Sequence, residues 1–118
     1  MNILHNTIEE LNSAMQWFLS NDLYVNHGTS DTTFTLPPRQ LHVWGEVASL
    51  TITLAEGEDG MTNEYKFSFT SGATPTTLSL PTGLKFPKEK GGLTIQANTI
   101  YEVSIQRGLV SWSGFDNA

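Results

Sequence analysis

The chain has 118 residues, of which 12 are acidic and 6 are basic, for a net charge of −6. This length suits one ordinary domain with a short appendage. The six Lys and Arg residues are scattered from Arg39 to Arg107, and nucleic-acid binding requires clustered cations, so we expect no nucleic-acid partner. No cysteine is present, which excludes disulfides and thiolate metal sites. We also expect no membrane insertion and no secretory signal, since no apolar run approaches the roughly 18–20 residues that cross a bilayer.

The first predicted element is an amphipathic helix over residues 1–20. Asn6 with Glu9, or Thr7 with Glu10, forms a capping-box pattern at its start. The apolar positions behind it follow spacings of 4, 3, 4 and 3, and they are Leu4, Ile8, Leu11, Met15 and Phe18. This is a short a/d seam of about two heptads. Two interpretations stay open: the helix packs on its own domain, or it oligomerises by burying the seam against other copies.

The pattern changes between residues 21 and 38. Residues 26–31 are rich in turn formers. The alternating piece Thr33–Leu36 ends on Pro37-Pro38, which predicts an edge or linker strand. We therefore divide the chain into residues 1–38, for oligomerisation or anchoring, and a β module over residues 39–118.

After Pro38 the apolar residues alternate with a period of two, with one Ser/Thr face and one apolar face. The predicted strands lie at 41–44, 49–54, 65–69, 78–80, 93–95, 101–105 and 110–112. Short strands punctuated by turns every 8–15 residues are typical of sandwiches and barrels. We predict a mainly β fold, an antiparallel β-sandwich or jelly-roll-like module preceded by a short N-terminal α-helix.

Residues that carry chemistry are sparse. His5, His27 and His42 lack the spacing of a metal site, and we expect His27 to be solvated in its turn. No nucleophile elbow, phosphate loop or dinucleotide fingerprint is present. We predict no metal, no cofactor and no enzymatic activity. One rival interpretation is a sugar hydrolase that pairs the carboxyl groups of Glu46 and Glu102.

Three aromatic residues within the predicted strands leave a binding function open. Trp44, Tyr101 and Trp112 present flat faces suited to sugar rings if they are exposed. Their alternating positions also suit core packing. The sequence therefore supports two alternatives for these side chains, core residues or contacts to a glycan.

Five strings between residues 42 and 105 resemble a known family. They are His42–Val47, Ser49–Leu54, Asn63–Gly72, Pro75–Pro81 and Ile95–Ile105. As an ordered set they are similar to small structural modules of tailed bacteriophages and prophages, found in tail-fibre, baseplate, receptor-binding and head-fibre proteins.

The resemblance implies a non-enzymatic virion protein, assembled in the host cytoplasm and then carried on the extracellular particle. It implies a homotrimer that contacts other virion proteins or a host-surface glycan, and it supplies no catalytic residues. The short chain favours a head-fibre, capsid-decorating or tail/baseplate accessory component. The alternative is a carbohydrate-binding adhesin that attaches to the host surface.

Overall fold

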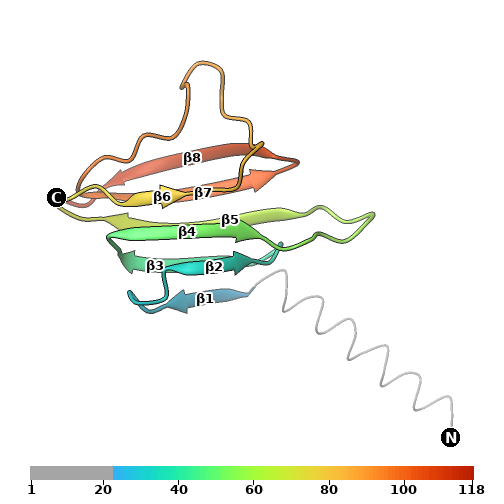
Figure 1. Cartoon of the computed structure of the whole chain (residues 1–118), viewed down its shortest axis with the longest axis horizontal. Coiled ribbons are helices and arrows are strands. Elements are labelled where there is room, and N and C mark those ends of the chain that lie inside the picture. The colour runs from blue at the N-terminus through green and yellow to red at the C-terminus, as the bar shows by residue number, and fades with distance from the viewer. Residues whose placement is uncertain (1–22) are drawn as a thin grey trace, which may run out of the picture.

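The computed structural model describes residues 23–118, which form two β-sheets (Figure 1). Its strands are β1 (Tyr24–His27), β2 (Thr33–Leu36), β3 (Leu41–Glu46), β4 (Ser49–Leu54), β5 (Glu64–Ser71), β6 (Thr77–Ser79), β7 (Thr99–Gln106) and β8 (Leu109–Asp116). The five-stranded sheet has the order β1-β3-β5-β7-β8, and the three-stranded sheet has the order β2-β4-β6. The prediction of a mainly β fold is confirmed.

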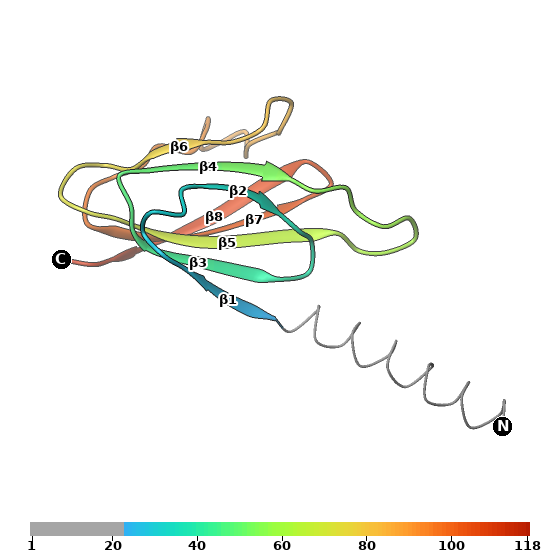
Figure 2. The same ribbon diagram turned by 60° about the horizontal axis from the view of Figure 1, so that its bottom comes forward.

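From β1 to β6 the chain alternates between the two sheets. Odd-numbered strands enter the five-stranded sheet and even-numbered strands enter the three-stranded sheet. Figure 2 shows the sheets as two layers, with β2, β4 and β6 above the others. Each consecutive pair of strands adds one strand to each sheet, so the chain winds around the interior that the two sheets share. β7 then turns back antiparallel to β5, and β8 completes a hairpin.

The prediction of antiparallel pairing is wrong for four of the six ladders. β1–β3, β3–β5, β2–β4 and β4–β6 are all parallel. Parallel strands need a crossover connection, and here each crossover contains a strand of the opposite sheet. Alternation identifies a strand and its buried face, but it does not identify the neighbour. The connection Val47-Ala48 between β3 and β4 is as short as a hairpin turn.

Most strand positions agree with the alternation, and two segments differ. β1 lies in a segment from which we predicted only turns, and residues 93–95 form no strand. The predicted edge strand before Pro37 is confirmed as β2, at the edge of its sheet. Both β1 and β2 fall within residues 1–38, yet they are hydrogen-bonded members of the two sheets.

The core lies between the facing sides of the two sheets. Its buried members are Leu36, Trp44, Val47, Leu50, Ile52, Phe67, Phe69, Tyr101, Val103, Ile105 and Val110. The Phe34 ring of β2 lies 5.7 Å from the Trp44 ring of β3, so side chains of the two layers meet directly. Burial of each large apolar side chain contributes roughly 1.5–3 kcal/mol.

The long connection between β6 and β7, residues 80–98, closes one side of the stack. Leu84 and Ile95 are among its side chains that pack against the core. Lys85 is joined to the β7–β8 hairpin by two backbone bonds: its N–H donates to the Gly108 carbonyl (2.8 Å), and its carbonyl accepts from Val110 (2.9 Å). This connection therefore adds apolar cover next to the three-stranded sheet.

The predicted helix over residues 1–20 lies outside the described residues. In the part of the chain that is described, no helix has the length and apolar character needed to span a membrane.

Candidate functional site

Trp112 is the most accessible of the three aromatic residues singled out from the sequence. It lies on β8 opposite Val103 of β7 and is half-buried. Phe86, from the 80–98 connection, meets its ring edge to face at 6.3 Å between centroids. The Lys90 ammonium lies 4.9 Å from the ring centroid, close enough for a cation–π attraction. These contacts hold the indole at the rim of the core.

Beside Trp112 lies an open hollow of about 610 Å³, which we name the C-terminal hollow. Its walls are the segment 94–99 and the end of β8. The lining side chains include Thr94, Gln96, Asn98, Tyr101, Trp112, Phe115 and Asp116. The volume falls in the range of small-molecule sites.

Tyr101 fixes the wall of this hollow. Its hydroxyl accepts a hydrogen bond from the Gln96 backbone N–H at 2.8 Å and donates to the Thr94 carbonyl at 3.3 Å. Gly114 is the cross-strand neighbour of Tyr101, and an added Cβ there would lie 3.1 Å from Thr99 Cγ2 and 3.4 Å from Tyr101 Cε1. A side chain at position 114 would therefore crowd the Tyr101 ring and narrow the hollow.

The C-terminal hollow combines apolar faces with hydrogen-bonding groups. Trp112 supplies an apolar face, because it shares one face of the β7–β8 hairpin with Tyr101. Phe115, which is 50% exposed, also borders the hollow, but the register places its side chain on the opposite face of β8. Amides from Gln96 and Asn98 and the carboxyl group of Asp116 supply donors and acceptors. A flat ligand with many hydroxyl groups matches this chemistry.

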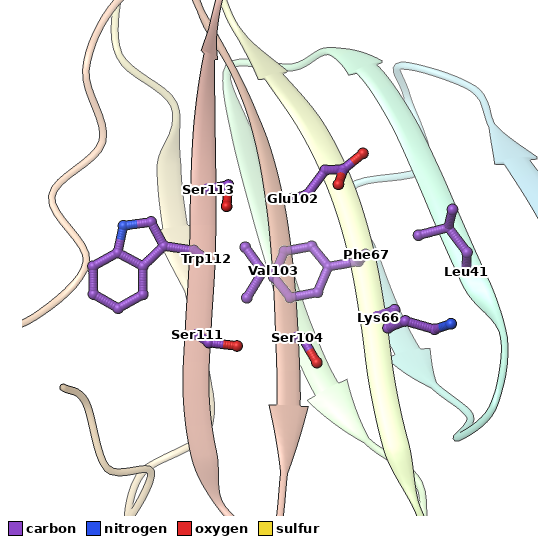
Figure 3. Close-up of a pocket in the computed structure, with 9 residues that line it drawn as sticks. All are labelled: Leu41, Lys66, Phe67, Glu102, Val103, Ser104, Ser111, Trp112 and Ser113. Atoms are coloured by element: carbon purple, nitrogen blue, oxygen red, sulfur yellow. The ribbon is translucent and has the colours of Figure 1, made fainter.

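A second, smaller hollow of about 290 Å³ lies over the five-stranded sheet. Figure 3 shows Glu102 and Ser104 of β7 between Lys66 of β5 and the serines of β8. Ser104 donates to the Glu64 carboxylate at 2.6 Å. Glu46 lines neither this hollow nor the C-terminal hollow, and its carboxyl group lies beside Gly72. Neither of these two hollows is therefore lined by the carboxyl groups of both Glu46 and Glu102.

A chain of polar side chains lies between the sheets near β1. Nδ1 of His27 donates to the Asp31 carboxylate at 2.6 Å, and Nε2 of His27 lies 2.7 Å from Nδ1 of His42. Nε2 of His42 in turn lies 2.8 Å from Gln40 Oε1. The expectation of a solvated His27 is wrong, because parallel pairing places it beside β3. Its side chain is only 6% exposed, and its ring stacks on Trp44 at 4.1 Å.

Burial, with a further contribution from nearby His27, lowers the pKa of His42 from 6.5 to about 4. His42 is therefore neutral at pH 7. Both ring nitrogens of His27 are engaged, one by Asp31 and one by His42. Neither nitrogen is left to activate a nucleophile, so this network holds β1 against β3. Among residues 23–118, His, Asp and Glu form no group of three that could hold a metal ion.

The structure separates the three aromatic candidates. Trp44 is 1% exposed and Tyr101 is 4% exposed, so both rings belong to the core. Tyr101 and Trp112 meet at the C-terminal hollow, whereas β5 and β7 separate Trp44 from β8 in the sheet order. The candidate oligomerisation residues lie outside the described residues, and they are Leu4, Ile8, Leu11, Met15 and Phe18.

Phe115 and Asp116 were not singled out from the sequence. They follow Gly114, where the alternation that marks the last strand stops, and nothing else in the sequence distinguishes them. Their importance follows from the β8 pairing, which places Asp116 beside Thr99 of β7.

No model of a known protein family matches the chain, and no curated protein or solved structure proved similar to it.

Proposed function

We propose that this chain is a non-enzymatic structural protein of a bacteriophage particle, which self-assembles and displays a β module. Its place on the particle is a head fibre, the capsid surface, or the tail and baseplate. The supporting observation is that the phage-like strings coincide with the strands that build both sheets. Ser49–Leu54 is β4, Asn63–Gly72 contains β5, and Ile95–Ile105 contains most of β7. The resemblance therefore falls on the framework of the domain.

For the finer fold class we propose a two-layer sandwich with parallel winding. A jelly roll is built from antiparallel strands, and the four parallel ladders of this chain do not fit that topology. The side-chain contact of Phe34 with Trp44 supports face-to-face packing of the layers.

Assembly in this proposal uses the apolar positions of the N-terminal segment. Burial of a seam shared by three copies gives a permanent homotrimer, since obligate interfaces typically remove roughly 2,000 Å² or more from water. The β modules then stay on the outside, available to other virion proteins. The particle forms in the host cytoplasm and leaves the cell as the virion.

The composition of purified particles tests this proposal. Particles from a culture that carries this gene are banded on a density gradient, dissociated, and analysed by quantitative mass spectrometry. We expect the chain to band with the particles at a fixed ratio to the major capsid protein. Recovery only in the unbanded soluble fraction would contradict the proposal.

The C-terminal hollow favours a second function, attachment to a host-surface glycan. Trp112 supplies an apolar face beside the amide and carboxyl groups of Gln96 and Asp116. In this version the β module is an adhesin, and a sugar ring lies against the accessible part of the Trp112 ring.

Paired substitutions test the glycan function. Trp112→Ala removes the apolar face, and Phe115→Ala is the matched control because Phe115 is 50% exposed on the opposite face of the same strand. On a glycan array and on host cells we expect binding by the wild type and the control, and at least about a tenfold loss in Trp112→Ala. Equal binding by all three proteins, or no binding by any, argues against this function.

A further inference from the structure

We propose that four side chains between β1 and β3 form a latch, which opens when its two imidazole rings bind a fourth proton. The side chains are Asp31, His27, His42 and Gln40, joined in that order by hydrogen bonds. We name them the histidine latch. Its opening releases β1 from β3 while the rest of the two sheets stays folded. The inference goes beyond the proposed function and does not depend on it.

The hydrogen bonds of the histidine latch limit the number of protons that the two rings carry. Nδ1 of His27 donates to the Asp31 carboxylate, which only accepts. Nε2 of His27 and Nδ1 of His42 lie 2.7 Å apart, so one of these nitrogens donates and the other accepts. Nε2 of His42 carries the remaining proton when it donates to Gln40 Oε1. The closed latch therefore has room for three ring protons.

Loss and gain of a ring proton have different consequences. With three protons one ring is an imidazolium, and the Asp31 carboxylate attracts this charge to His27. With two protons Nε2 of His42 accepts, and the Gln40 amide has only to turn its NH2 group toward it. With four protons both nitrogens between His27 and His42 are donors, so their hydrogen bond is lost. Only the fourth proton breaks the side-chain contact between β1 and β3.

Neighbouring elements do not bring a second carboxylate to neutralise that fourth proton. The strands β2 and β4 of the facing sheet contain no charged residue, and β2 presents the Phe34 ring 4.9 Å from that of His42. On β5 the register partner of His42 is Phe67. The other charged side chains of β3, β5 and the turn before β3 lie elsewhere, and they are Arg39 (beside Glu58), Glu46 (beside Gly72), Glu64 (bonded to Ser104) and Lys66 (at the smaller hollow).

Burial opposes the fourth proton as long as the latch is closed. The His27 side chain is 6% exposed and His42 is 3% exposed. Burial, and then the charge of His27, lower the pKa of His42 from 6.5 to about 4. Release of β1 returns His42 to water and to its ordinary pKa. The open state therefore binds more protons than the closed state below pH 6.5, and a falling pH favours opening.

The strand β1 is placed to leave the domain by itself. It has four residues and pairs only with β3. Tyr24 is 57% exposed, and Val25 is half-exposed, so apart from His27 the strand buries little side-chain surface. Elements with few buried contacts open locally at a lower free energy than the core. Release of β1 leaves the pairing of β3 with β5 in place.

Hydrogen exchange of single backbone amides, followed by NMR at pH 7 and pH 5, tests the latch in the full chain. The Leu41 N–H donates to the Leu23 carbonyl and reports on release of β1, whereas the Val47 N–H donates to the Thr70 carbonyl and reports on β3 with β5. After correction for intrinsic exchange rates, we expect the opening equilibrium at Leu41 to rise roughly twentyfold from pH 7 to pH 5, given the pKa of His42 in the two states. Val47 stays more protected than Leu41 at both pH values.

The matched control is His42→Gln, because its amide accepts a hydrogen bond from His27 but binds no proton. We expect the opening equilibrium at Leu41 in this variant to change by less than about twofold. An equal rise in both proteins would overturn the role of the fourth proton. Equal protection of Leu41 and Val47 would overturn the local release, since β1 would then open only with the whole domain.

The protonation of the imidazole rings provides a second test that needs no variant. Long-range 1H–15N correlation spectra of the wild type distinguish protonated from unprotonated ring nitrogens. In the folded chain at pH 5 we expect protons on both nitrogens of His27 and on Nε2 alone of His42. Protons on both nitrogens of both rings would contradict the latch, because the closed state would then already hold the fourth proton.

Discussion

His42 is held between His27 and Gln40, in surroundings that its position in the sequence does not reveal. Its two partners come from the neighbouring strand β1 and from the turn before β3. The contact with His27 requires β1 and β3 to be parallel, with His27 beside Trp44. Because we predicted no strand at β1, we expected His27 to lie in solvent, apart from His42.

This environment makes stability depend on pH. The pKa of His42 is about 4 in the folded protein and 6.5 without burial. As the pH falls from 6.5 toward 4, the unfolded chain takes up a proton that the folded chain excludes, so the free energy of unfolding decreases. The full loss is about 3 kcal/mol. Well above pH 6.5 the residue is neutral in both states and contributes no pH dependence.

Urea denaturation at pH 7 and pH 4.5 measures this effect when the wild type is compared with His42→Gln, which does not titrate. We expect the free energy of unfolding of the wild type to fall by roughly 2–3 kcal/mol more than that of the variant over this range. Carboxyl groups titrate in both proteins and cancel in the difference. Equal decreases would show that His42 is not held neutral by burial.

Thr76 joins the corner between β3 and β4 to the loop before β6. Its hydroxyl donates to the Val47 carbonyl at 2.6 Å, and its N–H donates to Ser71 Oγ at 3.1 Å. Thr76 is 4% exposed, so Thr76→Val leaves a buried carbonyl without this donor. We expect a loss of about 1–3 kcal/mol in the free energy of unfolding. The exposed Thr77→Val is the control, with an expected change within about 0.5 kcal/mol; similar losses in both variants would contradict the role of the bond.

At the scale of elements, the sequence predicts a strand best where one face is buried. Ser49–Leu54 alternates apolar and hydroxyl side chains over its whole length, and the predicted bounds are those of β4. β1 was missed because it has only four residues and stands next to turn formers. Leu93 and Ile95 alternate as in a strand, yet they pack on the core from the 80–98 connection without pairing to a neighbour.

The β7–β8 hairpin was the easiest connection to predict, because Arg107-Gly108 separates two alternating runs. Both residues have positive φ angles, 56° and 73°, as a two-residue type I′ turn requires. An added Cβ on Gly108 meets nothing within 4 Å. A Cβ at this position would therefore clash with nothing, and any loss of stability would come from the positive backbone angle φ.

Thermal and urea unfolding of Gly108→Ala test this turn. We expect a loss of roughly 1–2 kcal/mol, since L-residues pay about that much in the left-handed region. Gly45→Ala is the control, because Gly45 also has open space around its Cβ and does not have a positive φ. A comparable loss in both variants would point to a general effect of replacing glycine and would contradict a special need for glycine in the turn.

At the scale of the whole molecule, the winding of the chain between the two sheets could not be predicted from the sequence. A hairpin and a parallel winding both connect alternating strands by short links. A two-residue link such as Val47-Ala48 is therefore compatible with either topology. The candidate site shows the same limit. Trp112 could be singled out as an aromatic residue on a strand, but the neighbours that form the C-terminal hollow come from a segment that lies beside β8 only in the folded chain.

The winding also has a consequence for assembly. A stack of parallel coils has two ends, and the chain covers one of them with its own C-terminal hairpin. The other end is formed by β1 and β2, whose outer edges pair with no strand among residues 23–118, and the N-terminal segment precedes β1 in the chain. We predict that the apolar N-terminal positions determine the number of copies.

The mass of the full chain in solution, measured by native mass spectrometry, tests this claim most directly. For the wild type we predict a single species of about three times the 13.0 kDa chain mass. The double variant Leu11→Asp, Met15→Asp should be monomeric or insoluble, because two carboxylates in each seam cannot be buried together. A monomeric wild type, or a trimer that the double variant leaves intact, would contradict the account.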